Sequence, residues 1–152
     1  MSNISVQRKE VHRIIKERID MFGFMLQGAS DSSKPDFINF MHSIGLTAKS
    51  LPELIVSGNL EDDLDVEIML SVINSMEDGE PQLDTEINGI LKDYPIKIID
   101  VTGDKIKNNY TVILHDYYQG KDIKVYQILL PDDNGYFPDN ENYTGLPQEV
   151  LK

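Results

Sequence analysis

The chain has 152 residues, with 14 Lys and Arg against 26 Asp and Glu, and a formal net charge of −12 at pH 7. This length suits one domain, the 40% hydrophobic content is typical of globular proteins, and the absence of cysteine excludes disulfide scaffolds, thiolate metal sites and cysteine nucleophiles. The negative charge disfavours nucleic acid and anionic membranes as partners, because it repels phosphate at long range. The sequence shows neither an apolar run long enough to span a membrane nor a secretory signal, so we expect a cytoplasmic protein.

Helical periodicity dominates the start of the chain and predicts an amphipathic helix over residues 1–22. Gly23 follows at the place where a left-handed residue commonly closes a helix. We expect a short strand over residues 24–26 and then a polar loop over residues 28–36.

Two buried strands and a second helix are predicted next. Residues 37–46 are mainly apolar, and Gly45 within them indicates a bulge or a close approach of two backbones. Residues 53–57 form a β-branched run between proline and glycine, which is typical of a strand. Residues 61–76 show a helical stripe with acidic side chains at the start, where the helix dipole favours them.

The second half of the chain predicts two further strands, over residues 94–101 and 123–130. Residues 104–118 fit either a helix or a strand, and residues 138–152 read as a loosely anchored tail. We therefore expect a single compact domain over residues 1–152, in the α+β class or the α/β class, with a mixed β-sheet of about five strands packed with two or three helices.

Polar side chains flank the two buried strands in the middle of the chain. Such groups need partners, so they either tie the strands together or converge on a pocket. The candidate pocket residues are His42, Ser43, Thr47, Glu53 and His115. Zinc spacing, EF-hand loops, phosphate-binding glycine loops and the serine nucleophile elbow are all missing from the sequence, so it indicates no metal, no cofactor and no catalytic residue.

Acidic residues are concentrated in one stretch, because residues 61–86 hold ten acids and no base. Residues 1–20, by contrast, hold five basic side chains and three acidic ones. The candidate interaction face consists of Asp62, Asp63, Asp65 and Glu67. We expect a non-enzymatic protein that binds another, basic protein through this face, of the inhibitor, immunity or phage accessory type, and one variant of the hypothesis is mimicry of nucleic acid. The alternative is a small-molecule-binding or catalytic domain with a pocket near His42, Ser43 and Glu53. The sequence leaves the oligomeric state and the source open.

Three segments together resemble a bacterial family known only as domain of unknown function 4262. They are residues 40–47, residues 51–58 and residues 126–138, and a middle segment over residues 91–96 is also similar. Two positions depart from the family pattern, which often has tyrosine in place of His42 and tryptophan in place of Leu130. The resemblance extends over nearly the whole chain and implies a shared fold. It implies no activity, because the family has none assigned.

Overall fold

The computed structural model describes residues 3–61, 63–119 and 121–152. Along the chain the helices and strands are α1 (Asn3–Phe22), β1 (Met25–Ala29), β2 (Phe40–Ile44), η1 (Thr47–Lys49), β3 (Glu53–Ser57), α2 (Leu64–Ser75), η2 (Met76–Asp78), β4 (Glu86–Ile87), β5 (Ile96–Asp100), α3 (Asp104–Asn109), α4 (Val112–Tyr117) and β6 (Val125–Leu129). Among the described residues, no helix combines the length and apolar character that a membrane span requires.

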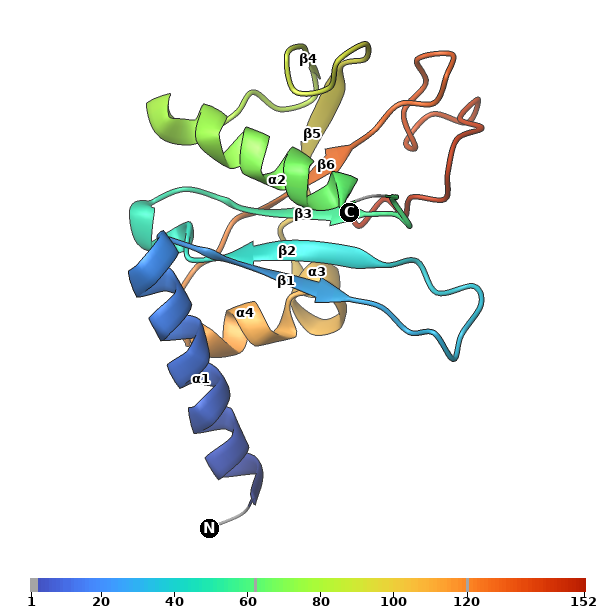
Figure 1. Cartoon of the computed structure of the whole chain (residues 1–152). Helices are drawn as coiled ribbons and strands as arrows, with labels where there is room; N and C mark the ends of the chain where they lie inside the picture. Colours follow the sequence, from blue (N-terminus) through green and yellow to red (C-terminus); the bar gives the residue numbers. More distant parts are fainter. Residues whose placement is uncertain (1–2, 62, 120) are drawn as a thin grey trace.

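The strands form one mixed sheet in the order β1-β2-β3-β6-β5-β4. β3 and β6 are parallel, and the other neighbouring strands are antiparallel. Helix α2 covers one face of the sheet, while α3, α4 and part of α1 cover the other (Figure 1). The chain is therefore a single α+β domain, and the short strand β4 adds a sixth strand to the five expected.

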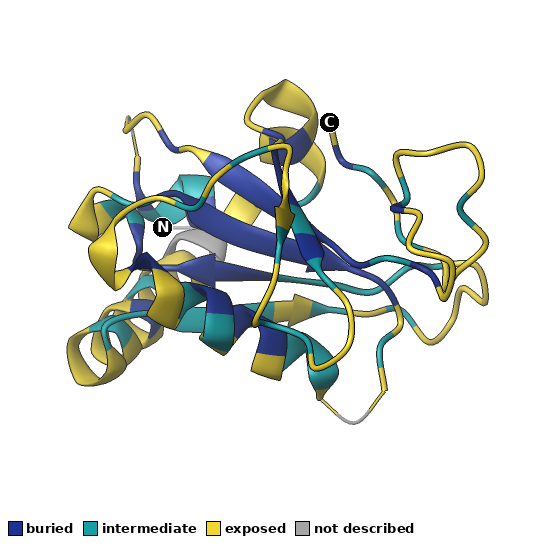
Figure 2. Ribbon diagram, turned by 90° about the horizontal axis from the view of Figure 1, so that it is seen from above, coloured by how far each residue is buried: buried dark blue, intermediate teal, exposed yellow. Residues whose placement is uncertain are grey.

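Two hydrophobic cores lie on opposite faces of this sheet. Every residue of the central strands β3 and β6 is buried, because helices cover both of their faces (Figure 2). The core beneath α2 includes Leu54, Val56, Met69, Ile98 and Ile128. The core on the other face includes Ile15, Ile44, Ile55, Leu114 and Leu151.

Residues 104–118, which the sequence left between helix and strand, are helical. They form two helices of six residues each, α3 and α4, separated at Thr111. The Thr111 hydroxyl donates to the carbonyl oxygen of Ile106 at 3.1 Å, and the Thr111 carbonyl accepts from the backbone N–H of His115 at 3.0 Å. The β-branched residues that suggested a strand therefore lie at this helix junction.

The C-terminal segment is anchored at more points than the sequence predicts. Leu151 is fully buried, and its backbone N–H donates to the side-chain oxygen of Gln127 in β6 at 2.9 Å. The Gln127 amide nitrogen donates in turn to the Glu149 carbonyl oxygen at 2.6 Å. The buried Gln127 side chain thus anchors the C-terminal segment to β6 by bonding the backbone of Glu149 and Leu151.

Candidate functional site

The carboxylate of Glu53 is fully buried at the start of β3 and accepts hydrogen bonds from the β2–β3 connection. One oxygen, Oε1, accepts from the Ser43 hydroxyl at 2.7 Å and from the Leu46 N–H at 3.2 Å. The other, Oε2, accepts from the Thr47 N–H at 2.8 Å and from the Thr47 hydroxyl at 2.5 Å. The Gly45 N–H adds a longer contact to Oε2 at 3.4 Å. We call these four donor residues and Glu53 the Glu53 network.

Ser43 links this network to the sheet. The regular pairing of β2 with β3 ends at His42 and Ile55. Beyond that pair the backbone N–H of Leu54 donates to the Ser43 hydroxyl oxygen at 2.9 Å. The Ser43 hydroxyl therefore accepts a hydrogen bond that a carbonyl of the neighbouring strand would normally accept, and it donates a hydrogen bond to Glu53. The arrangement joins the ends of the two strands.

Glycine at position 45 permits this geometry. Gly45 has φ +124°, and a Cβ atom placed there would lie 2.8 Å from the Cα atom of Phe24. Only glycine adopts this conformation at such a close approach without strain. Of the two features that the sequence left open at Gly45, a bulge or a close approach of two backbones, the structure shows the close approach.

Burial raises the pKa of the Glu53 carboxyl above its ordinary value, and the hydrogen bonds from Thr47, Ser43 and Leu46 oppose that shift. The pKa of the Tyr118 hydroxyl is raised to about 12, mainly by burial and next by the charge of Glu53. The Glu53 carboxylate and Ser43 are thus shielded from solvent, and Thr47 is half-buried at the edge of the network.

His42 lies on the sheet face covered by α4, because alternate residues of a strand share a face and its neighbours Phe40 and Ile44 pack there. It is 2% exposed, and its Nδ1 donates to the Ser43 carbonyl oxygen at 3.1 Å. Burial lowers the pKa of His42, the hydrogen bond to the Ser43 carbonyl raises it, and the charge of His115 lowers it further. No described hydrogen bond joins His42 to His115.

The histidines do not activate Ser43. The Nδ1 of His115 donates to the Thr111 carbonyl oxygen at 2.8 Å. The Ser43 hydroxyl donates to Glu53 and accepts from the Leu54 N–H. A serine nucleophile needs a hydrogen bond to a histidine, which no described hydrogen bond of Ser43 supplies. Within the ranges that the structure describes, no three metal-binding side chains gather at one place.

A cleft of about 740 Å³ lies elsewhere in the molecule, where loops from four parts of the chain meet. We call it the loop cleft. Its walls are the approach to α2, residues 91–94, residues 130–134 and residues 143–148. The apolar lining residues are Leu60, Leu64, Leu91, Leu130, Pro131, Leu146 and Pro147. None of the five pocket residues that the sequence singled out lines this cleft.

Asp132 joins two walls of the loop cleft. Its Oδ1 accepts from the backbone N–H groups of Asn134 and Tyr136, both at 2.9 Å, and its Oδ2 accepts from the Thr144 N–H at 2.9 Å. Burial alone would raise the pKa of Asp132, but the hydrogen bonds from Thr144, Tyr136 and Asn134 hold it below the ordinary value. The carboxylate therefore stays ionised and fixes the loop geometry.

Gln148 makes a second link between the same two walls, residues 130–134 and residues 143–148. Its amide nitrogen donates to the Leu130 carbonyl oxygen at 3.0 Å, and its amide oxygen accepts from the Leu130 N–H at 2.9 Å. The same nitrogen donates to the hydroxyl of Tyr143 at 2.8 Å, and that hydroxyl donates to the Leu146 carbonyl. The cleft is held in shape by these side-chain contacts to the backbone.

The rim of the loop cleft is acidic. Its lining residues include one lysine, Lys92, and three aspartates, Asp93, Asp132 and Asp133. Asp93 and Asp133 are exposed. Three of the four residues of the predicted acidic face, Asp63, Asp65 and Glu67, lie at the start of α2 around the lining residue Leu64, and the fourth, Asp62, lies outside the described residues. The exposed carboxylates of Asp93 and Asp133 therefore line a cleft with an apolar floor, while Asp63, Asp65 and Glu67 are not among its lining residues.

The segments that the sequence singled out occupy defined places in this geometry: residues 40–47 and 51–58 together form the Glu53 network, and residues 130–134 form a wall of the loop cleft. No curated protein and no solved structure matches the chain. A family described as "Domain of unknown function (DUF4262)" matches residues 18–144, a range that contains the Glu53 network and the loops that Asp132 joins. Because this match covers most of the 152 residues, the chain belongs to that family.

Proposed function

We propose that this protein is a non-enzymatic binding protein that takes a basic, apolar segment of a partner protein into the loop cleft. The observation that carries the proposal is the combination of an apolar floor with an acidic rim. Inhibitors, immunity proteins and phage accessory proteins act by binding in this way. Charge complementarity between rim and partner would raise the rate of association and the selectivity.

Two exposed apolar side chains favour a protein partner. Leu146 and Tyr94 line the cleft and are 55% and 42% exposed. Exposed apolar groups beside charged ones are typical of protein recognition surfaces, where the apolar centre supplies affinity and the charged rim supplies orientation. The rim acids Asp93 and Asp133 would pair with lysine or arginine of the partner.

The experiment is a binding titration with two short synthetic peptides, one of alternating lysine and leucine and one with glutamate in place of lysine. We expect the cationic peptide to bind and the acidic one to fail, with affinity that falls as salt is raised. The double variant Asp93→Asn with Asp133→Asn should weaken binding about fivefold, because each rim charge contributes modestly. Asp104→Asn, an exposed acid on α3, is the charge control.

Two substitutions of exposed apolar residues by serine distinguish binding in the cleft from nonspecific hydrophobic binding. Leu146 in the cleft and Val112 on α4 are almost equally exposed, at 55% and 54%. Leu146→Ser should weaken binding of the cationic peptide and Val112→Ser should not. Equal effects of the two substitutions, or equal affinity for both peptides, would remove the proposal.

A small-molecule ligand is the second candidate, favoured by the cleft volume of about 740 Å³, which falls within the usual range for ligand pockets. Native mass spectrometry of protein captured from its host lysate, with and without nuclease, distinguishes the two. A stoichiometric protein partner supports the first candidate, and a bare chain with a small additional mass supports the second.

A further inference from the structure

Helix α1 makes little contact with its own domain. It has 20 residues, and Ile15 is its one buried side chain among residues 6–22, where side chains are described. Figure 1 shows its N-terminal end lying away from the sheet. The face toward the domain is marked by Ile15 and by Arg8 and His12, which both contact Asp116 of α4. In proteins most helical stability comes from packing of an apolar face, and α1 packs little of its length against its own domain.

A second apolar stripe runs along α1 beside that face. Val11, Ile14 and Met21 are 42%, 37% and 73% exposed, and Phe22 at the end of the helix is 67% exposed. Together with the exposed Arg18, the stripe positions 11, 14, 18 and 21 are separated by steps of three, four and three residues. This spacing is the a/d repeat by which two helices pack along a common seam.

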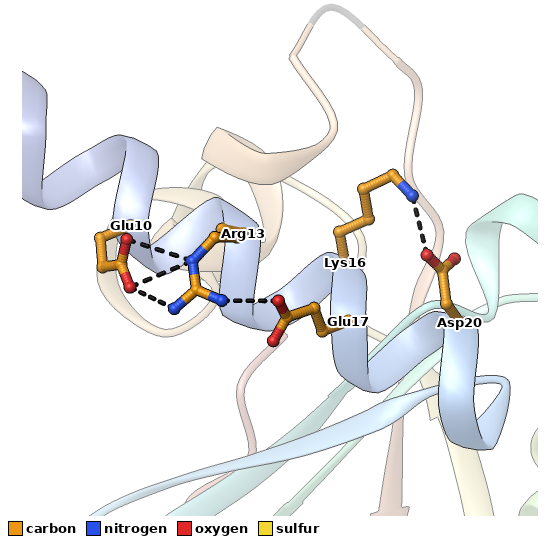
Figure 3. Close-up of polar contacts among 5 residues, drawn as sticks. All are labelled: Glu10, Arg13, Lys16, Glu17 and Asp20. Atoms are coloured by element: carbon orange, nitrogen blue, oxygen red, sulfur yellow. Dashed lines mark hydrogen bonds and ion pairs between the residues drawn. The ribbon is translucent and has the colours of Figure 1, made fainter.

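Arg18 is the one charged residue among the stripe positions 11, 14, 18 and 21. Arg13 is paired with Glu10 and Glu17 of its own helix, and Lys16 is paired with Asp20, as Figure 3 shows. Within the described part of the chain, Arg18 forms no ion pair. Glu10 and Glu17 immediately precede the stripe residues Val11 and Arg18, so they occupy the g positions that flank such a seam.

We infer that the α1 stripe pairs with the α1 stripe of a second copy of this chain, with the two helices antiparallel. In a parallel pair, Arg18 would face Arg18 of the other copy, and the two charges would repel. In an antiparallel pair centred between Ile14 and Arg18, Arg18 faces Ile14 of the other copy and lies within reach of Glu10 and Glu17 there. The same surface serves both copies, as a two-fold dimer interface requires.

Sedimentation equilibrium over a range of protein concentrations tests this inference. We expect the wild-type chain to shift from its 17.3 kDa monomer mass toward twice that mass as concentration rises. Ile14→Glu should weaken self-association by about tenfold or more, because it removes an apolar contact and places a carboxylate in the seam. Arg18→Leu should strengthen it, since a charged residue at a core position of the seam costs stability.

Leu70→Glu is the matched control, because Leu70 is 40% exposed, close to the 37% of Ile14, and lies on α2, which covers the opposite face of the sheet. It should leave the dissociation constant unchanged, and circular dichroism of every variant confirms that the fold is intact. A wild-type protein that stays monomeric up to its solubility limit would overturn the inference, as would a dimer that Ile14→Glu and Arg18→Leu leave unaltered. The peptide titration of the loop cleft is independent of either result.

Discussion

Two buried carboxylates organise two different regions of this domain. Glu53 is fully buried, and its donors come from a single connection between adjacent strands. Asp132 is 6% exposed, and its donors come from two parts of the segment that follows β6, residues 134–136 and Thr144. The hydrogen bonds of Glu53 join the ends of two neighbouring strands, whereas those of Asp132 join two walls of a cleft.

The difference shows what a cluster of polar residues does when it is enclosed. Ser43, Thr47 and Glu53 satisfy one another's hydrogen bonds, so the network contributes to the fold and leaves little capacity for a ligand. The Asp132 carboxylate is also occupied by hydrogen bonds to the backbone, but the apolar and acidic side chains around it line an open cleft. The site for a partner is therefore expected where loops meet.

The largest effect is expected from removing the Glu53 carboxylate. Glu53→Ala leaves buried N–H and hydroxyl donors without an acceptor, and we expect the free energy of unfolding to fall by about 3 to 5 kcal/mol. Urea denaturation measures the change. Glu67→Ala, an exposed acid on α2, should change it by less than about 0.5 kcal/mol. A loss below about 1 kcal/mol for Glu53→Ala would mean that the network is not a main stabilising element.

Gln127 should have the next largest effect, because it anchors the segment that forms one wall of the loop cleft. Gln127→Leu leaves the Glu149 carbonyl and the Leu151 N–H without their partner, and we expect a loss of about 2 kcal/mol in the free energy of unfolding. Limited proteolysis should then cut the C-terminal segment first. Gln119→Leu, at an exposed position, serves as the control, and equal losses in the two variants would refute the anchoring role.

Stability should fall as the pH is lowered, through His42. Because burial lowers its pKa below the ordinary 6.5, the unfolded chain takes up a proton before the folded protein does. The free energy of unfolding should drop by about 1 kcal/mol between about pH 7.5 and about pH 5.5 on this account. Urea midpoints at the two pH values measure this drop.

Glu53 acts with the opposite sign. Its pKa is raised above 4.5 in the folded state, so its contribution is fully present below 4.5 and is lost as the pH rises through the raised value. His42→Gln separates the two groups, because it removes the His42 contribution alone. The variant should show a smaller drop than the wild type, and an unchanged drop would assign the pH dependence to other groups.

The smallest and most local effect is expected at the loop cleft. Asp132→Asn removes the charge that accepts from the backbone of Asn134, Tyr136 and Thr144. Hydrogen exchange of these three amides should become faster, while the Thr47 amide in the Glu53 network keeps its rate. Faster exchange spread over both regions would show that the two carboxylates do not act separately.

Local sequence patterns predicted the parts of the molecule that are formed by neighbouring residues. The strand over residues 53–57, the close approach at Gly45 and the grouping of Ser43 with Glu53 all involve one short connection. The junction at Thr111 could not be assigned, since a β-branched run is compatible with a strand or with a short helix.

The loop cleft could not be predicted in the same way. Its walls come from segments that lie far apart in the sequence, and loops carry no periodicity that reveals their packing. The contact of Asp132 with Thr144 depends on the tertiary fold, which no local pattern describes. The acidic run at the start of α2 flanks the lining residue Leu64, and its role in binding stays a prediction.

The most direct test of this account is an NMR titration of the isotopically labelled protein with the cationic lysine–leucine peptide. The account predicts shifts of the amides of Leu60, Leu64, Tyr94 and Leu146 around the loop cleft, with the amides of Ser43 and Thr47 unmoved. Shifts centred on Ser43 and Thr47, with the cleft amides unmoved, would contradict it and would place the binding site at the Glu53 network.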